Sequence, residues 1–241
     1  MNQATVDAVL RAAAYVDAHG DPRERARAAA LAGRADAAQA LWSPDASDAA
    51  SVREALGAAD DLRALGDPRV ADWAAALARA QADDGGFAPA LAPDARRFET
   101  GMIAGHLAKT RYARPALLLG AADFLARQWS PDLVQGGSWH AIAAYAHCFA
   151  NVDHDESDAI LQWCGRELGR GFVTRAFDAV RTARVLVYCD AHGLPGAELT
   201  REDLLIALLT EQGGDGSFAD GASDDRVRAT LDGLVALRRL G

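Results

Sequence analysis

Apolar residues recur in this chain at the three- and four-residue spacing of one helix face. Val70, Trp73 and Leu77 form one such stripe, and the same spacing returns across residues 225–240. β-branched residues are few, and no segment alternates apolar and polar residues as a half-buried strand does. The pattern therefore predicts an all-α protein.

The helical pattern is also repeated. The segment YVDAHGDP at residues 15–22 returns as YCDAHGLP at 188–195, and predicted helix ends recur about every 45 residues. Asp21 and Pro22 read as an N-cap followed by a first-turn proline. Four predicted helix ends carry a glycine that is expected to adopt the left-handed conformation: Gly20, Gly66, Gly193 and Gly241.

Each repeat has the length of one helical hairpin. One set of helices is expected at 4–19, 52–65, 97–110, 140–151, 176–192 and 225–240. The other set is expected at 22–40, 68–81, 114–128, 157–168 and 199–211. Because distinct polar capping repeats are missing, we expect one domain over residues 1–241 that closes into a ring of hairpins.

Short segments that run from Gln to an aromatic residue follow several predicted helices. QADDGGF spans residues 81–87, QGGDGSF spans 212–218, and QWSPDLVQGGSW at 128–139 has the same frame with a longer turn. These segments resemble the QW repeat of the terpene cyclase and protein prenyltransferase superfamily, which includes the squalene-hopene cyclases. ILQWCGRELGRGF at 160–172 resembles a degenerate copy. The resemblance covers about residues 68–241.

The resemblance implies an α/α toroid with about six inner and five outer helices, in which the helix after each QW turn is inner. Helices beginning near residues 97, 140, 176 and 225 would then line the centre, and by the period those near 4 and 52 as well. Each Gln is expected to bond the backbone of the next loop, and each aromatic residue to fill a seam between hairpins. These stapling residues are Gln81, Gln212, Phe87, Phe218 and Trp139.

Composition narrows the possible partners. The net charge of −9 and the pI of about 5.1 argue against nucleic acid, which favours a basic surface. No window contains the roughly 18 apolar residues of a membrane span, and the N-terminal segment MNQATVDAVLRAAAYVD lacks a signal-peptide pattern. Cys148, Cys164 and Cys189 are isolated, which fits a reducing compartment. We therefore expect a cytoplasmic protein that acts on a small molecule.

Acidic residues after the QW turns are candidates for the catalytic acid. Class II terpene cyclases use an Asp-rich DxDD motif whose central Asp protonates an alkene. The segment ADGASDDRVRATL at 219–231 resembles this motif at Asp224 and Asp225, with Ala222 at the first Asp position. Glu99 occupies the equivalent place after the earlier QW turn. Helix capping by the same residues is the structural alternative.

Polar residues on the predicted inner helices form stripes that would face the centre of the ring. The candidate proton acceptors are His140, His106 and His147, and the candidate substrate-binding residues are Arg181, Arg184, Tyr188, Arg228 and Trp139. Such a cavity is polar, whereas a pocket for a long polyene would be lined with aromatic residues, which are only 7% of this chain. The alternative is a network of salt bridges that fills a narrow ring.

No metal site or cofactor is predicted. Protein prenyltransferases bind zinc through Asp, Cys and His, and their Asp-x-Cys element is missing here. The N-termini of the inner helices converge, so they could hold an anion such as a diphosphate, and Mg²⁺ would be expected only with that type of substrate.

Three classes of function fit these patterns. The preferred one is a terpene-cyclase-like or prenyltransferase-like enzyme that acts by acid–base chemistry on an isoprenoid or other unsaturated small metabolite. The second is a non-catalytic toroid that binds a small molecule or a protein. The third is a carbohydrate-active hydrolase or lyase, with Glu99 paired with Asp224 or Asp225 about 5–10 Å apart. The oligomeric state stays open.

Overall fold

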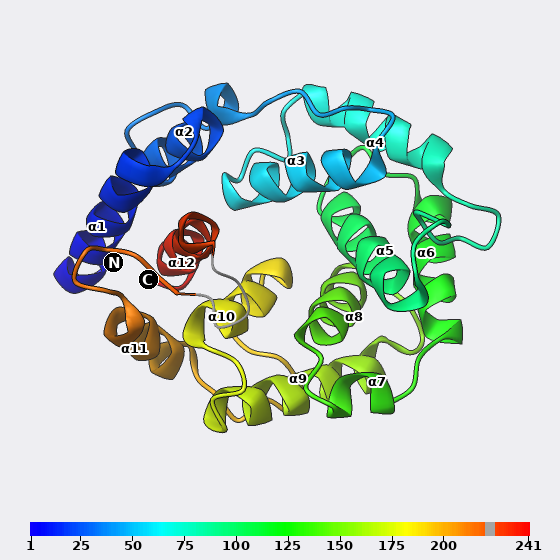
Figure 1. Cartoon of the computed structure of the whole chain (residues 1–241). Helices are drawn as coiled ribbons and strands as arrows, with labels where there is room; N and C mark the ends of the chain where they lie inside the picture. The colour runs from blue at the N-terminus through cyan, green and yellow to red at the C-terminus, as the bar shows by residue number, and fades with distance from the viewer. Residues whose placement is uncertain (220–224) are drawn as a thin grey trace.

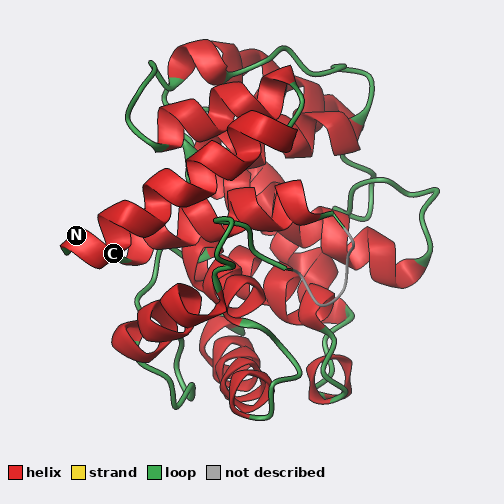
Figure 2. Cartoon of the chain, turned by 60° about the vertical axis from the view of Figure 1, so that its left-hand side comes forward, coloured by secondary structure: helices red, strands yellow, loops and turns green. Residues whose placement is uncertain are grey.

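The structure, a computed structural model, describes residues 1–219 and 225–241, which fold into helices joined by loops. No strand occurs within these two ranges, as Figure 2 shows, and the all-α prediction is confirmed. The elements are α1 (Gln3–His19), α2 (Pro22–Leu31), the 3₁₀ helix η1 (Ala38–Ala40), α3 (Ala49–Asp61), α4 (Arg69–Ala80), α5 (Pro93–Ala108), α6 (Pro115–Arg127), α7 (Asp132–Gln135), α8 (Trp139–Asn151), α9 (Ser157–Val173), α10 (Ala179–Tyr188), α11 (Arg201–Glu211) and α12 (Arg226–Leu240).

Most helices begin and end within a few residues of their predicted bounds. The main exception is α2, which was expected to reach residue 40 and ends at Leu31. Gly33 adopts a φ of 77°, and the Arg34 N–H donates to the Ala29 carbonyl over 2.8 Å. This left-handed glycine ends the helix, because residues with a side chain rarely adopt that conformation.

The glycines predicted to be left-handed adopt other conformations, and that prediction is wrong. The residues concerned are Gly20, Gly66, Gly193 and Gly241. After α3 and α10 the left-handed position is taken instead by Arg63 and Asp190, with φ of 54° and 48°. Both helices end before the predicted glycine, which therefore lies further along the following loop.

The helices follow one another around a ring (Figure 1). In this view α3, α5, α8, α10 and α12 lie toward the centre, with α4, α6, α9 and α11 outside them. The central helices are buried around most of their circumference: in α8 every residue from Ile142 to Phe149 is buried. The outer helix α11 buries only Leu204 and Leu208. Polar side chains on the central helices must therefore find their partners inside the ring.

The N-terminal helix α1 was expected to be inner, but Figure 1 shows it outside α12. It buries one stripe, which includes Ala8, Ala12 and Val16, and it packs chiefly against α12 and α2. The last helix of the chain is thus paired with the first, and the ring closes without a covalent link. The sequence pattern could not distinguish the two positions, because an amphipathic stripe fits either layer.

Two glycines let α5 and α8 pack closely, and this helix pair has the most extensive contact in the structure. An added Cβ on Gly101 would lie 2.5 Å from the Ala144 carbonyl oxygen, and one on Gly105 would lie 2.4 Å from the His147 ring. Both distances are shorter than any non-bonded contact that a carbon atom tolerates. The spacing Gly-x-x-x-Gly therefore fixes how near the two central helices approach.

The two compact QW-like turns make the same contacts. Gln81 Nε2 donates to the carbonyls of Gly85 in its own turn and Leu117 in α6, each over 2.9 Å. Gln212 Nε2 donates to the carbonyls of Gly216, over 3.1 Å, and Ala8 in α1, over 2.9 Å. These contacts confirm the predicted role of the two glutamines. Leu117 of α6 and Ala8 of α1 accept equivalent hydrogen bonds. By this contact, α1 occupies the same position in the last hairpin as α6 does in an earlier one.

The two remaining QW-like segments do not repeat these contacts. Gln128 accepts a hydrogen bond from Arg97 over 3.2 Å, and the stretched turn that follows contains the short helix α7. The segment 160–172 lies wholly inside α9, so its interpretation as a degenerate turn is wrong. Unpaired backbone groups occur at helix ends, so a Gln in the middle of a helix has none nearby to bond.

Replacing Gln212 by Ala tests how the ring is closed. We expect a loss of about 1–3 kcal/mol in the free energy of unfolding, because the carbonyls of Gly216 and Ala8 lose their donor. Gln135→Ala, at an exposed helical position, is the matched control and should change stability by less than about 0.5 kcal/mol. Urea denaturation of both variants measures the difference, and equal values would contradict this role of Gln212.

Candidate functional site

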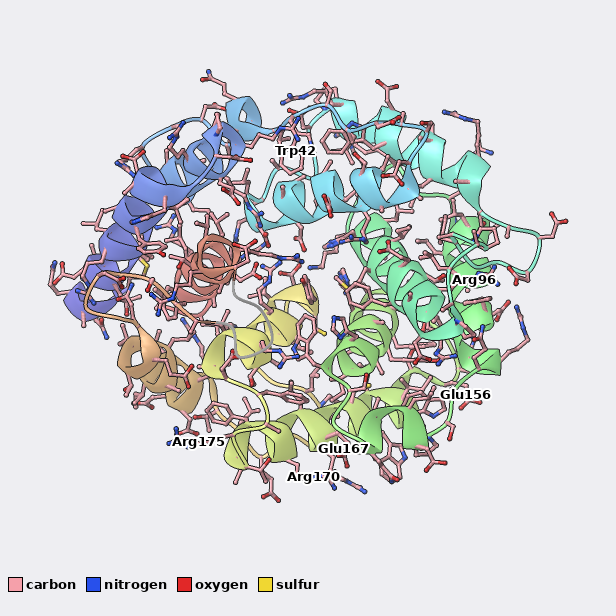
Figure 3. The ribbon with its side chains drawn as sticks, viewed as in Figure 1. Trp42, Arg96, Glu156, Glu167, Arg170 and Arg175 are labelled. Carbon is pink, nitrogen blue, oxygen red and sulfur yellow. The ribbon has the colours of Figure 1, made fainter. Side chains whose placement is uncertain are left out.

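The centre of the ring contains a cavity of about 280 Å³. Figure 3 shows side chains from several central helices pointing into this region, with Trp42 between α2 and α3. Charged residues dominate its wall. The lining residues are Asp21, Arg23, Glu24, Arg27, Trp42, Arg53, Glu54, Gly57, Ala58, Asp61, Met102, His106, Arg184, Tyr188, Asp225, Arg228, Leu231 and Asp232.

The cavity has an exposed rim and a buried floor. Arg23, Glu54 and Arg228 at the rim are exposed, whereas Asp61 and His106 are buried. The rim includes residues from the first turns of α3 and α12, and the floor lies near the last turns of α3 and α5. A ligand entering past the helix N-termini would therefore meet charged groups first and an imidazole at the bottom.

Five of the predicted site residues line this cavity: His106, Arg184, Tyr188, Asp225 and Arg228. Asp225 has a second role, because its side chain accepts a hydrogen bond from the Arg228 N–H over 3.0 Å and caps α12. The capping alternative therefore holds for Asp225, and it does not prevent the same carboxylate from facing a ligand. Asp224 lies outside the described residues.

The other predicted residues lie away from the cavity wall. Glu99 accepts a hydrogen bond over 2.7 Å from Arg53, which does line the cavity. Trp139 Nε1 donates to the Arg181 carbonyl over 2.8 Å, so these two residues join α8 to α10. His140 is exposed and packs edge to face against Phe98 and Trp139, and His147 is buried behind His106.

A buried ion cluster forms part of the floor. Asp61 accepts hydrogen bonds from Arg184, over 2.7 Å, and from Arg27, and Arg184 also faces Asp232 at 3.3 Å. Burial, together with the charge of Arg184, lowers the pKa of Arg27 to about 10. Burial opposes the charge on Arg184 too, but Asp232 and Tyr188 raise its pKa. Both guanidinium groups thus stay charged at neutral pH, with Asp61 between them.

A second cluster surrounds the neighbouring carboxylate. Asp60 contacts Lys109 at 2.8 Å and Arg239 at 3.2 Å, and both of these cations also reach Asp190. Burial alone would raise the pKa of Asp60, but His106 and Lys109 hold it well below its usual range. Asp60 and Asp61 point to different partners because consecutive helical residues face different sides.

The two buried histidines are held in their neutral form. Burial lowers the pKa of His106, although Asp60 opposes the shift. Burial lowers the pKa of His147 well below its usual value, and the neighbouring His106 and Lys109 add to the effect. The His147 ring also stacks on Tyr188 with ring centroids 5.1 Å apart. A neutral imidazole at the cavity floor can accept a proton or bind a metal ion.

Sequence reasoning missed several residues of the cavity wall and of the ion clusters: Arg27, Arg53, Asp60, Asp61 and Trp42. Asp60 and Asp61 carried a usable signal, since they interrupt the apolar helix EALGAADDLRAL, where two carboxylates need buried partners. The partners of Asp61 come from α2 and α10, and those of Asp60 come from the end of α5 and from α12. All of them are distant in sequence, so only the folded ring identifies them.

Comparisons of this chain with protein-family models, with curated proteins and with solved structures found no match. The resemblance to terpene cyclases and protein prenyltransferases therefore stays a prediction. Across the described residues, none of the helices combines the length and the apolar character that spanning a bilayer requires. The functional argument depends on the geometry and charge of the central cavity.

Changing Asp61 to Asn tests whether the floor cluster holds the ring together. We expect a loss of about 3–5 kcal/mol in the free energy of unfolding, because Arg27 and Arg184 would be left as buried cations without their shared anion. Asp232→Asn, at a side chain that is 27% exposed, should cost less than about 1 kcal/mol. Thermal or urea denaturation compares the two, and a small effect at Asp61 would show that the cluster contributes little.

Proposed function

We propose that this chain is an α/α-toroid enzyme of the terpene-cyclase-like kind that acts by acid–base chemistry on a small metabolite with an anionic end. The observation that carries the proposal is the central cavity, which combines guanidinium groups at its rim with a neutral imidazole at its floor. The repeated Gln contacts of the two QW-like turns support the toroid part of the proposal. The proposed inner helices are α3, α5, α8, α10 and α12, and α1 belongs to the outer layer.

The cavity wall favours a short substrate. Its volume of about 280 Å³ is just below the range for small-molecule sites, roughly 300–1,000 Å³. Trp42 and Tyr188 are the aromatic residues that line it. Enzymes that fold long polyenes steady carbocations on many aromatic faces, so an isoprenoid substrate here would be a short one. Its charged end would be a diphosphate or a carboxylate, which Arg53 and Arg228 are placed to bind.

Asp225 and His106 are the proposed acid–base pair. Asp225 lines the cavity from the N-cap position of α12, and His106 lines it from the last turn of α5. The Asp225 carboxyl group would supply a proton to the unsaturated bond, and neutral His106 would accept one at the other end of the cavity. Mg²⁺ would take part only if the charged end is a diphosphate.

The alternatives are less well supported by the cavity. A glycoside hydrolase with Glu99 as one of two carboxylates would need Glu99 at the wall, whereas Arg53 engages it outside the lining. A binding module without chemistry would use the same cavity and the same arginines. Ligand binding and turnover must therefore be measured separately.

Ligand-induced thermal stabilisation tests the binding part of the proposal. Geranyl diphosphate and farnesyl diphosphate, with and without Mg²⁺, are compared with neutral polyenes and acidic oligosaccharides. A short diphosphate at 100 times its dissociation constant should stabilise the protein by about 2.7 kcal/mol. Arg228→Met should abolish the shift, because Arg228 lines the cavity, whereas Arg226→Met, at an exposed position of the same helix turn, should retain it.

The pattern across this panel distinguishes the alternatives. A shift produced by oligosaccharides alone would favour the hydrolase, and no shift with any compound would favour a protein-docking toroid. An equal loss in the Arg226 and Arg228 variants would place the anion outside the cavity.

Asp225→Asn tests the chemical part of the proposal. Asn caps a helix about as well as Asp, so we expect the melting temperature to stay within about 1–2 °C of the parent protein. Product formation from the stabilising ligand should fall by about 10²-fold or more, because the amide cannot supply the proton. Gas chromatography of the products measures turnover. Full activity in the variant would remove Asp225 from the acid role.

A further inference from the structure

Three side chains of the metal-ligand type meet beneath the cavity floor, where His106 is the member of the three that lines the cavity. Asp60, His106 and His147 come from α3, α5 and α8, and one potential ligand atom of each lies within 4.8 Å of the other two. His106 Nδ1 is 3.5 Å from Asp60 Oδ2, and the two imidazole rings meet edge to face with centroids 4.4 Å apart. Two imidazoles with one carboxylate are a ligand set that divalent transition ions favour.

The ring nitrogens of this cluster lack partners. His147 is fully buried, yet among the described residues neither its Nδ1 nor its Nε2 has a hydrogen bond. The buried His106 Nδ1 makes only the long contact of 3.5 Å with Asp60 Oδ2. Buried polar atoms in native proteins are almost always paired with protein, water or an ion, so an imidazole with two unpaired nitrogens lacks part of its environment.

Glycines create the space that both imidazole rings occupy. An added Cβ on Gly105 would lie 2.4 Å from the His147 ring, so no larger residue fits there without moving it. On the other side, an added Cβ on Gly57 would lie 3.4 Å from His106 Nε2. Glycines in α3 and α5 thus leave room for two imidazole side chains. A purely apolar core would have aliphatic side chains at these positions.

We propose that Asp60, His106 and His147 bind one divalent first-row transition ion, with an open coordination position directed to the central cavity. Because His106 lines the cavity, an ion has a route from the rim to this site. Tetrahedral Zn²⁺ with bonds of about 2.0–2.1 Å requires ligand atoms about 3.4 Å apart. The ligand atoms, which now lie within 4.8 Å of one another, must therefore move closer through side-chain rotation when the ion binds.

The protonation states suit such an ion. Burial lowers the pKa of both histidines, so no proton has to leave an imidazole before it coordinates. Lys109 and Arg239 hold the Asp60 carboxylate in position, and Asp190 contacts both of these cations. The two cations, Lys109 and Arg239, balance the two carboxylates of Asp60 and Asp190. A bound ion therefore adds net positive charge, which an anionic ligand in the cavity would offset.

The inference changes one step of the proposed function. An ion with three protein ligands and an open position lowers the pKa of a bound water or polarises a substrate oxygen. With the ion present, that water rather than the His106 ring would exchange the proton with the substrate. The metal site rests on its own geometry, however, and its test needs no substrate.

Cobalt binding tests the site directly. The full chain, without a histidine tag and freed of metal by a chelator, is titrated with Co²⁺ and followed by visible absorption, and bound Zn²⁺ is counted by mass spectrometry. We expect one ion per chain and the intense visible bands of four-coordinate cobalt. His147→Phe should weaken cobalt binding by at least about 100-fold. Loss of a residue that only supports a metal ligand costs about 10–100-fold, so a larger effect identifies His147 as a ligand itself. Phe is apolar and of similar size, so the fold should tolerate it.

His140→Phe is the matched control, since it makes the same substitution on α8 at an exposed position and should keep full affinity. If His147→Phe fails to fold, nitrogen NMR of the parent protein replaces it, and both His106 and His147 ring signals should shift on adding Zn²⁺. Absence of stoichiometric cobalt binding in the parent protein would overturn the proposal, as would equal binding by both variants.

Failure of the metal site and failure of the proposed enzyme can be told apart. Arg228→Met removes a cavity arginine and leaves the three ligands intact, so it should bind cobalt normally while it loses the diphosphate shift. Cobalt binding without any ligand-induced stabilisation would support the metal site and contradict the proposed substrate class.

Discussion

The structure depends on the non-covalent seam between its last and first helices. In an open array of hairpins the final inner helix would expose an apolar face, but here α1 covers α12. Gln212 ties the QW-like turn before α12 to the Ala8 carbonyl, and Arg11 donates to Gln212 Oε1 over 2.7 Å. Closing the ring surrounds the central helices on all sides, and this enclosure is what creates a cavity with a buried floor.

Enclosure also explains the unusual chemistry of the floor. Helices at the centre of a small ring cannot turn their charged side chains to solvent, so each charge must meet an opposite one within the ring. Asp61 does so with Arg27 and Arg184, and Asp60 with Lys109 and Arg239. The same enclosure keeps His106 and His147 neutral, and among the described residues neither ring nitrogen of His147 has a hydrogen bond. A salt-bridge network that served only to fill the ring would not require two neutral, buried histidines.

The sequence predicted the helices well because their apolar stripes are strong local signals, and it predicted the bonds of Gln81 and Gln212 because the two turns share one pattern. It could not decide that α1 is an outer helix, since one amphipathic stripe suits either layer. At the site it identified His106, Arg184 and Arg228 from their helical spacing, but it gave His147 a role at the wall, whereas that ring lies behind His106. Asp60 and Arg27 were missed because the contacts that define them join distant helices.

The closeness of the two chain ends has a topological consequence. Figure 1 places both termini beside α1 and α12, and Gly241 packs near Thr5. The hairpin formed by α12 and α1 is equivalent to the one formed by α5 and α6, except that no loop connects its helices. The arrangement of the hairpins therefore does not depend on the point of the ring at which the chain begins. A circularly permuted chain, with its old ends joined and new ones cut in the segment between η1 and α3, would specify the same circle of hairpins.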